Sequence, residues 1–563
     1  MNPTKRGETM KSNHIKVSVR VGSNQNGSLS FFSKTRSALG AILIAGCLVG
    51  VVFGYATAKS NKSGDIDIEL TNIEKLGKYV FFDKISSPKR MGCVTCHDPK
   101  TGGTGSVAGV NLHQVAITGA NPHTIGNLKP PTNAYATFIG PLAPCNFGVP
   151  GWCGGNFWNS RSEGNEWPPQ FPEGAAKHLG EEVFYKTDGT PLPDDLQDAY
   201  SLYFGPTADQ ALNPMPNPVE QNIDRKAVCQ HVKSAKYAPL YKLVWGVDID
   251  CSDTPVAVSA PDMDPLVNTQ ADPSLFPEKA FDISFKRIML AVCAWQASPD
   301  LNSFSSRRDI ELRNDEDGLF PLDGFTDEEN LGHDLFYGVE SALNPDGKSA
   351  GCAGCHSDNP GADTGEEPEQ LYSDDGFHNI GVPRNPEIPP TYNADGTLID
   401  PDLGLAGLTG VVGDPLSPGC TAGGFRRNCD HRGFHKTTTL RNVNKRKGEG
   451  FTKAYTHNGW FKSMESIVHF YNTGLIGGPT ADSFGITRCP DGIETERDAL
   501  ANNCWPAPAY ANPLQPGSPT FGAVLGGGRF GDLGLTLEEE AAIVAYLKTF
   551  TDTHTAKAPK PYK

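Results

Sequence analysis

The chain has 563 residues, enough for two to four domains, and a formal net charge of −16. This acidic balance, with no basic stripe beyond the first forty residues, argues against nucleic-acid binding. Its 62 glycines and 45 prolines make up 107 of the 563 residues, more than the usual combined share of roughly 12%. They occur in no low-complexity tract, which predicts a compact protein with long surface loops.

The N-terminus has the pattern of a targeting or anchoring segment. Seven Lys and Arg residues and one acid fall within residues 1–36, and an uncharged, apolar run follows from Ser37 to Ala58. The run is long enough to span a bilayer, with its basic flank in the cytoplasm. The sequence leaves three alternatives for this segment: a cleaved signal peptide, an uncleaved membrane anchor, or a lipoprotein signal processed at Cys47. Each places residues 60–563 in the periplasm, exported or anchored to the inner membrane.

Hydrophobic periodicity predicts a mainly helical protein. Apolar residues recur at helical spacing in six segments, several of them bounded by capping residues. These segments are 72–83, 224–246, 279–298, 326–338, 463–472 and 536–550. Two stretches rich in Pro and Gly, 132–218 and 360–436, predict long ordered loops.

Two copies of the motif C-x-x-C-H carry most of the chemical information. They comprise Cys93, Cys96 and His97, and Cys352, Cys355 and His356. This spacing lets two thiols form thioethers to one porphyrin while the adjacent His reaches the iron. The alternatives are a redox dithiol and a zinc site, but a zinc site would need the two Cys pairs to lie near each other and would not need a His after each. The motifs therefore predict two covalently attached c-type haems.

A similar helix precedes each motif, so the chain contains an internal repeat. The segments 74–83 and 329–338 share a Glu-x-Leu-Gly start and an apolar face. Thr326 with Glu329 predicts a capping box, and the last helix begins with another at Thr536 and Glu539. The repeat predicts two cytochrome c-like haem domains. The expected boundaries are 1–60 for the basic and apolar N-terminal segment, 61–315 for the first domain and 316–555 for the second.

The remaining cysteines fit an oxidising compartment. Eight of them are close neighbours in sequence and predict four local disulfides, although the sequence alone does not prove their connectivity. The neighbours are Cys145 with Cys153, Cys229 with Cys251, Cys420 with Cys429, and Cys489 with Cys504. Cys293, in an apolar helical run, is expected to be a buried free thiol.

With these motifs the chain resembles the bacterial diheme cytochrome c peroxidase and MauG family over roughly residues 70–550. The further signs are Phe157-Trp158-Asn159-Ser160-Arg161, Gln210 through Pro214 to Glu220, Thr439-Leu440-Arg441-Asn442-Val443, and Tyr455 to Gly459 followed by Tyr471. The resemblance implies that hydrogen peroxide is reduced at the N-terminal haem and that the C-terminal haem handles electrons.

The resemblance also implies roles for single residues around the first haem. Glu220 would ferry the proton between the peroxide oxygens and Gln210 would hold peroxide in place. Trp158 would lie between the haems, and Arg161 and Arg441 would contact the haems. An insertion at about 162–209 separates Arg161 from Gln210 beside the site, and both a lid and a partner surface stay open for it.

The sixth ligand of the second haem distinguishes the members of the family. Peroxidases of the family have Met at this position and MauG has Tyr, and this chain has Tyr471. Met464, expected on another helical face, and His469 are the rival ligands. A phenolate favours oxidised iron, whereas a thioether raises its potential. Three functions follow: peroxide reduction with a small cytochrome c or cupredoxin as donor, MauG-like oxidation of an organic or protein substrate, and pure electron transfer.

The family also binds calcium between its haems, which makes calcium a further candidate cofactor. Lys129 stands near the position of an expected Asn ligand. The backbone carbonyls of Thr452 and Ala454 are the remaining candidate ligands. His378 is expected to pack near the second haem in a structural role.

Overall fold

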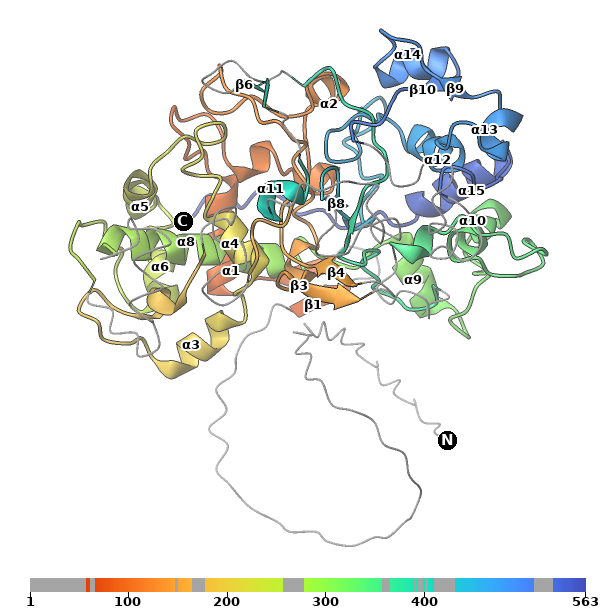
Figure 1. Cartoon of the computed structure of the whole chain (residues 1–563). Helices are drawn as coiled ribbons and strands as arrows, with labels where there is room; N and C mark the ends of the chain where they lie inside the picture. The colour runs from red at the N-terminus through yellow and green to blue at the C-terminus, as the bar shows by residue number, and fades with distance from the viewer. Residues whose placement is uncertain are drawn as a thin grey trace, which may run out of the picture.

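The computed structural model describes two groups of helices with short strands and loops between them (Figure 1). The described residues are 57–60, 66–146, 150–164, 178–256, 278–356, 365–388, 391–392, 398–399, 403–409, 431–510 and 530–563. Nearly all of the apolar run 37–58 lies outside these ranges, and its last two residues begin strand β1. None of the helices in the described ranges has the length and apolar character needed to cross a bilayer.

In the first half of the chain the elements are β1 (Thr57–Ser60), β2 (Ile66–Glu69), α1 (Asn72–Phe82), η1 (Cys93–Thr95), η2 (Pro99–Thr101), α2 (Ala108–Leu112), η3 (Ala136–Phe138), β3 (Ala143–Asn146), β4 (Pro150–Cys153), η4 (Glu181–Phe184), α3 (Asp194–Ser201), α4 (Pro206–Ala211), α5 (Arg225–Ser234), α6 (Ala238–Trp245) and α8 (Ala280–Ala297). In the second half they are α9 (Arg307–Asn314), α10 (Asp327–Tyr337), η6 (Cys352–Gly354), β5 (Phe377–His378), β6 (Thr391–Tyr392), β7 (Leu398–Ile399), α11 (Ala406–Thr409), β8 (His435–Lys436), α12 (Met464–Thr473), α13 (Pro479–Ser483), β9 (Thr487–Arg488), α14 (Glu496–Ala501), β10 (Cys504–Trp505) and α15 (Leu537–Lys548).

The strands of the described chain form two-stranded sheets only. The pairs β1–β2, β3–β4, β5–β8 and β6–β7 are antiparallel, and β9–β10 is parallel. In the β5–β8 pair, Phe377 lies opposite Lys436 and His378 opposite His435. Both strands lie within the stretch 360–436 that was expected to be a long loop, and their pairing brings its early part against its end.

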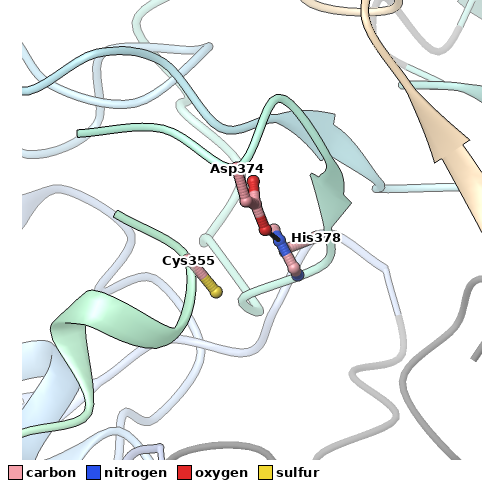
Figure 2. Close-up of side chains that lie close together, drawn as sticks. All are labelled: Cys355, Asp374 and His378. Carbon is pink, nitrogen blue, oxygen red and sulfur yellow. Dashed lines mark hydrogen bonds and ion pairs between the residues drawn. The ribbon is translucent and has the colours of Figure 1, made fainter. Parts of the chain in front are cut away.

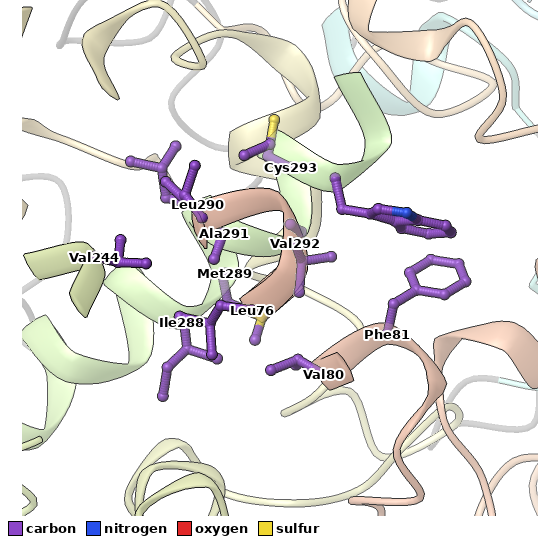
Figure 3. Packing of buried hydrophobic residues seen from close by; sticks show 14 of the residues in the cluster. Leu76, Val80, Phe81, Val244, Ile288, Met289, Leu290, Ala291, Val292 and Cys293 are labelled. Carbon is purple, nitrogen blue, oxygen red and sulfur yellow. The ribbon is translucent and has the colours of Figure 1, made fainter. Parts of the chain in front are cut away.

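The first helical core is built around the crossing of α1 and α8. A capping box of Thr71 and Glu74 begins α1. Leu76 and Val80 of α1 are fully buried and lie with Ile288 of α8 in the cluster of Figure 3. The two backbones meet at Gly77, where a Cβ atom would stand only 1.8 Å from the carbonyl oxygen of Ala291 on α8. A glycine is therefore required for so close a crossing.

The second core repeats this crossing with α10 and α15. The capping boxes predicted for Thr326 with Glu329 and for Thr536 with Glu539 are both present, which confirms them. A Cβ atom at Gly332 of α10 would stand 2.0 Å from the carbonyl oxygen of Ala542 on α15. The repeat read from the sequence therefore extends to the contact that each repeated helix makes with its partner.

Two sequence expectations differ from the structure. The helix expected over 224–246 is two helices, α5 and α6, because Ala235 is extended (ψ 152°) and Pro239 begins a new first turn. The long loop expected over 132–218 contains α3 and α4. Part of the expected insertion also packs inward, since Leu179 and Val183 belong to the first core. Its residues 165–177 lie outside the described chain.

The cysteine predictions are confirmed where the structure describes them. Disulfides join Cys145 to Cys153, Cys229 to Cys251, and Cys489 to Cys504. The fourth expected disulfide, between Cys420 and Cys429, lies outside the described residues. Cys293 is a buried free thiol.

The C-terminal tail returns from the second core to the first (Figure 1). The hydroxyl of Tyr79 on α1 donates a hydrogen bond to the carbonyl of Lys560 (2.7 Å), and the ring of Tyr562 stands edge-on to the ring of Tyr79. The two cores are thus tied together by the chain end, while the domain boundaries at 61–315 and 316–555 stay a prediction.

Candidate haem centres

The first C-x-x-C-H motif forms a single turn, η1, that orients its histidine. His97 follows this turn, and its Nδ1 lies 3.0 Å from the carbonyl oxygen of Gly103. A backbone carbonyl accepts the Nδ1 proton, which leaves the Nε2 lone pair available to a metal. Burial lowers the pKa of His97, which favours the neutral imidazole that a metal ligand requires.

The second motif reproduces this arrangement. Cys352 begins the turn η6, and the Nδ1 of His356 lies 2.9 Å from the carbonyl oxygen of Tyr372. Burial again lowers the pKa of the imidazole. Both histidines are therefore held in the same tautomer by a backbone acceptor from a later loop.

Each motif opens onto its own cavity, and the larger cavity belongs to the second motif. The predicted site residues on the first cavity are Cys93, Cys96, His97, Trp158, Gln210 and Glu220. Those on the second are Cys352, Cys355, His356, Trp158, Arg441 and Tyr471. All four motif cysteines are free thiols. Two thiols and a neutral imidazole on the wall of a mostly apolar cavity fit a thioether-linked haem in each.

Two polar side chains, an amide and a carboxyl, also line the first cavity. Gln210 extends from α4, and its side-chain amide makes no hydrogen bond within the described chain. An oxygen of Glu220 accepts a hydrogen bond from Asn217 (2.6 Å). Burial raises the pKa of Glu220, opposed by the charge of Arg161 and by the Asn217 bond. Asn217 was missed from the sequence, although its spacing of three residues from Glu220 is typical of a turn contact.

Arg161 contacts the wall of the first centre rather than its cavity. Its guanidinium lies 3.7 Å from the ring centroid of Phe157. Phe157 itself has a φ of 70°, a left-handed conformation that is rare for a bulky residue. Burial raises the pKa of Glu220, and the positive charge of Arg161 opposes this rise. The contact of Arg161 with a haem stays a prediction.

Trp158 lies between the two cavities and lines both of them. Its side chain is buried, and its Nε1 donates a hydrogen bond to the carbonyl oxygen of Lys129 (2.8 Å). The imidazole of His457 stands edge-on to the indole and is stacked on that of His435, with ring centroids 3.5 Å apart. Sequence analysis missed this histidine stack because no motif or periodicity links the two residues.

Helix α12 presents two candidate ligands to the second cavity. Tyr471 and Met464 both line it. The expectation that Met464 faces elsewhere is wrong, since seven residues are two helical turns and return to the same face. The Nδ1 of His469 instead lies 2.9 Å from a carboxylate oxygen of Glu540 on α15, away from the cavity. Burial raises the pKa of Tyr471.

Arg441 lines the second cavity but its charge is already paired. Two of its guanidinium nitrogens donate to the two carboxylate oxygens of Asp309, at 2.7 and 3.0 Å. The rings of Tyr135 and Phe304 lie on the guanidinium. Neither Arg441 nor Asp309 is exposed. A role for Arg441 in holding a haem stays a prediction.

A further cluster lies beside the second motif. Figure 2 shows the side chains of Asp374 and His378 directed at each other, with the sulfur of Cys355 nearby. The His378 Nε2 and an Asp374 oxygen are 2.8 Å apart, and the ligand atoms of all three residues lie within 4.8 Å of one another. Cys352 is not part of this cluster, so the two motif thiols do not converge on one metal site here. His378 lines the second cavity, as expected.

Comparisons with known proteins agree with this arrangement. Residues 71–317 match the family described as di-haem cytochrome c peroxidase. The chain is 24% identical over 481 residues to methylamine utilization protein MauG of Paracoccus denitrificans (strain Pd 1222), covering 85% of this chain and 88% of that protein. It is 26% identical over 164 residues to cytochrome-c peroxidase IdrP2 of Denitromonas iodatirespirans, covering 29% of this chain and 36% of that protein.

Among solved structures, the diheme peroxidase BthA from Burkholderia thailandensis E264 has a similar fold. The TM-score is 0.52 at 20% sequence identity, and the match covers 89% of this chain and 95% of that chain. At this identity the likeness concerns the fold alone.

Proposed function

Because this chain belongs to the di-haem cytochrome c peroxidase and MauG family, we propose that it reduces hydrogen peroxide at the first haem centre with electrons passed through the second. It is an enzyme of the cytochrome c peroxidase family, and the family carries two c-type haems. One observation carries the proposal: the unbonded amide of Gln210 and the half-buried carboxyl of Glu220 line the same cavity as a C-x-x-C-H motif.

The residues that would hold the haems are those of the two motifs. When bound, a c-type haem supplies an iron that exchanges electrons and, where a coordination position is free, takes up a ligand. The thiols of Cys93 and Cys96 and the Nε2 of His97 would hold the first. The thiols of Cys352 and Cys355, the Nε2 of His356 and the phenol oxygen of Tyr471 would hold the second.

Glu220 and Gln210 would handle the protons and the position of peroxide. Reduction of hydrogen peroxide to two waters consumes two protons and two electrons, and cleavage of the O–O bond requires that one oxygen lose a proton and the other gain one. The carboxylate of Glu220 takes up that proton and returns it, and its raised pKa brings proton affinity closer to neutral pH. The hydrogen bond from Asn217 fixes the carboxyl, and the amide of Gln210 donates to a peroxide oxygen.

Trp158 would connect the two centres. Its indole lines both cavities, so it offers an aromatic ring through which electrons could pass between them. The hydrogen bond from its Nε1 to Lys129 fixes the plane of the ring. A small cytochrome c or cupredoxin would deliver the electrons in this reading.

Tyr471 favours a second candidate, MauG-like oxidation of an organic or protein substrate. A phenol oxygen as the sixth ligand would hold the second iron oxidised and make it a poor acceptor for a high-potential donor. Tyr471 lines the second cavity, and its hydroxyl makes no hydrogen bond within the described chain. In this candidate, peroxide is still consumed at the first centre but the electrons come from the substrate.

Electron paramagnetic resonance with peroxide titration of the purified protein tests these proposals. We expect one high-spin and one low-spin haem at rest and peroxide consumption with reduced cytochrome c or cupredoxin. Peroxide consumption without oxidation of either donor would favour the second candidate. Two six-coordinate, low-spin haems and no peroxide turnover would mean that the chain is only an electron carrier.

We further propose that residues 60–563 lie outside the cytoplasm, in the periplasm or anchored to the inner membrane. The three disulfides of the described chain suit an oxidising compartment. Fractionation of cells that express the full chain, with an alkaline wash of the membranes, separates a released protein from an anchored one. Recovery of the haem protein from the cytoplasm would contradict this proposal.

A further inference from the structure

A lysine ammonium is enclosed by backbone carbonyls between the two centres. The side chain of Lys453 is 5% exposed. Its Nζ donates to the carbonyl oxygens of Thr101 (2.9 Å), Asn442 (2.7 Å) and Lys445 (3.2 Å). Three acceptors require three N–H donors, which only the protonated amine supplies. A cation therefore already occupies this carbonyl cage.

Lys129 is a second buried ammonium in the same region. It is 8% exposed, and its Nζ donates to the hydroxyl of Thr104 (2.9 Å) and the carbonyl oxygen of Pro130 (3.3 Å). Both lysine side chains line the second cavity. Within the described chain neither forms an ion pair with a carboxylate. Burial lowers the pKa of each, and the charge of Lys129 lowers that of Lys453 further.

Calcium, the metal implied by the family, does not fit these residues. Calcium takes six to eight oxygen ligands, and carboxylates normally supply part of the charge. Here the ammonium groups of Lys453 and Lys129 would repel a divalent ion, and this repulsion is strong in the low dielectric of the protein interior. Of the two carbonyls expected as ligands, that of Thr452 already accepts a hydrogen bond from Asn111 (2.9 Å).

We propose that the ammonium of Lys453, with that of Lys129 beside it, is a built-in cation between the haem centres and that this chain takes no calcium there. The cage joins the two halves of the molecule: Thr101 follows the first motif, whereas Asn442 and Lys445 belong to the second half. The carboxylates of a haem in the second cavity would balance the two charges.

The cage also bears on the ligand of the first centre. A Cβ atom at Gly102 would lie 3.4 Å from the Lys453 Nζ and 2.8 Å from the Cβ of Asn442, so the loop at residues 102–103 packs directly on the cage. The carbonyl of Gly103 in that loop orients His97. Loss of the ammonium is therefore expected to loosen the support of His97.

Metal analysis of the wild-type holoprotein is the first test. The protein is purified without chelator, and its calcium is measured by mass spectrometry against its haem content. We expect far less than one calcium per chain, and no change of melting temperature or haem spectrum with EGTA. One calcium per chain, or a melting temperature that falls with EGTA, would overturn the proposal. Neither readout depends on peroxide turnover, so this result is independent of the proposed function.

Two substitutions then test the cage itself. Lys453→Ala opens it, and we expect a melting temperature several degrees lower and a shifted spectrum of the first haem. Ammonium chloride should recover both, whereas calcium chloride and tetramethylammonium chloride at equal ionic strength should not. Lys453→Met removes the charge but fills the space, so ammonium should not recover it. The exposed Lys242→Ala is the control and should behave as wild type.

Several results of these variants would reject the proposal. They are a Lys453→Ala protein as stable as wild type, a recovery by calcium greater than that by ammonium, and an equal recovery of Lys453→Met. If Lys453→Ala does not fold, the calcium content of the wild-type protein decides the question by itself.

Discussion

The two candidate haem centres hold their motif residues in the same way but differ in the other residues that line their cavities. In both, a single turn carries the two thiols, and a backbone carbonyl holds the Nδ1 of the following histidine. The first cavity is also lined by Gln210 and Glu220, whereas the second is lined by Tyr471 of helix α12. The repeat therefore extends to the turn and the histidine of each motif, whereas the other lining residues of the two cavities differ.

These lining residues differ because different elements supply them. In the first cavity these residues come from the short helix α4 and the turns that follow it. The second comes from a ten-residue helix packed on α15, which brings a side chain directly into the cavity. Polar groups on the cavity wall suit a substrate, and a side chain from a packed helix suits a fixed ligand. Four substitutions or measurements test this contrast.

The largest effect is expected from Glu220→Gln. Removal of the proton carrier should lower kcat/KM for peroxide by roughly 10²- to 10⁴-fold, which is about 3–5 kcal/mol of activation free energy. The resting spectrum of both haems should stay unchanged, because Gln keeps the volume of the side chain. Glu181→Gln, an exposed change in the same half, is the control. A loss of less than tenfold would show that Glu220 does not move the proton.

The next largest effect concerns the close helix crossing that is present in both cores. Gly77→Ala and Gly332→Ala each place a methyl group within about 2 Å of a carbonyl oxygen of the partner helix. Each should therefore cost about 1–3 kcal/mol of unfolding free energy or more, as overpacking does. Gly109→Ala, whose methyl group would meet open space, is the control. Denaturant titrations followed by haem absorbance measure the loss. Wild-type stability in either variant would mean that the crossings are not tightly packed.

Tyr471→Met should sharpen the difference between the centres. A thioether in place of a phenol oxygen should raise the reduction potential of the second haem and leave that of the first unchanged. Met464→Leu on the same helical face should change neither, because it keeps the packing and removes only the rival sulfur. Spectroelectrochemistry measures both haems. If Met464→Leu changes the second haem's spectrum instead, Met464 is the ligand.

The smallest effect is a shift in pH dependence. The carboxylate of Glu220 is the form that takes up a proton, so kcat/KM for peroxide should fall as pH drops through its pKa. Burial raises that pKa above the ordinary value of a glutamate, and the charge of Arg161 opposes the rise. Arg161→Leu should therefore move the acid limb of the profile to higher pH. A limb that stays in place would remove Arg161 from the electrostatics of the site.

Much of the candidate site was predictable because its signals are local. The C-x-x-C-H motifs, the capping boxes and the three observed disulfides each depend on residues close together in sequence. The split of 224–246 into two helices was also within reach, since Pro239 marks it. The paired charge of Arg441 was not, because its partner Asp309 lies 132 residues away.

The sequence by itself predicted two attached haems, the thiols and histidines that would hold them, and the repetition of the motif. Only the tertiary structure decided which side chains face each haem cavity. It turned His469 toward Glu540, left Met464 beside Tyr471, and enclosed the ammonium of Lys453 in carbonyls from both halves. The physical reason is that covalent spacing acts over a few residues, whereas burial, charge pairing and cavity walls arise where distant segments meet.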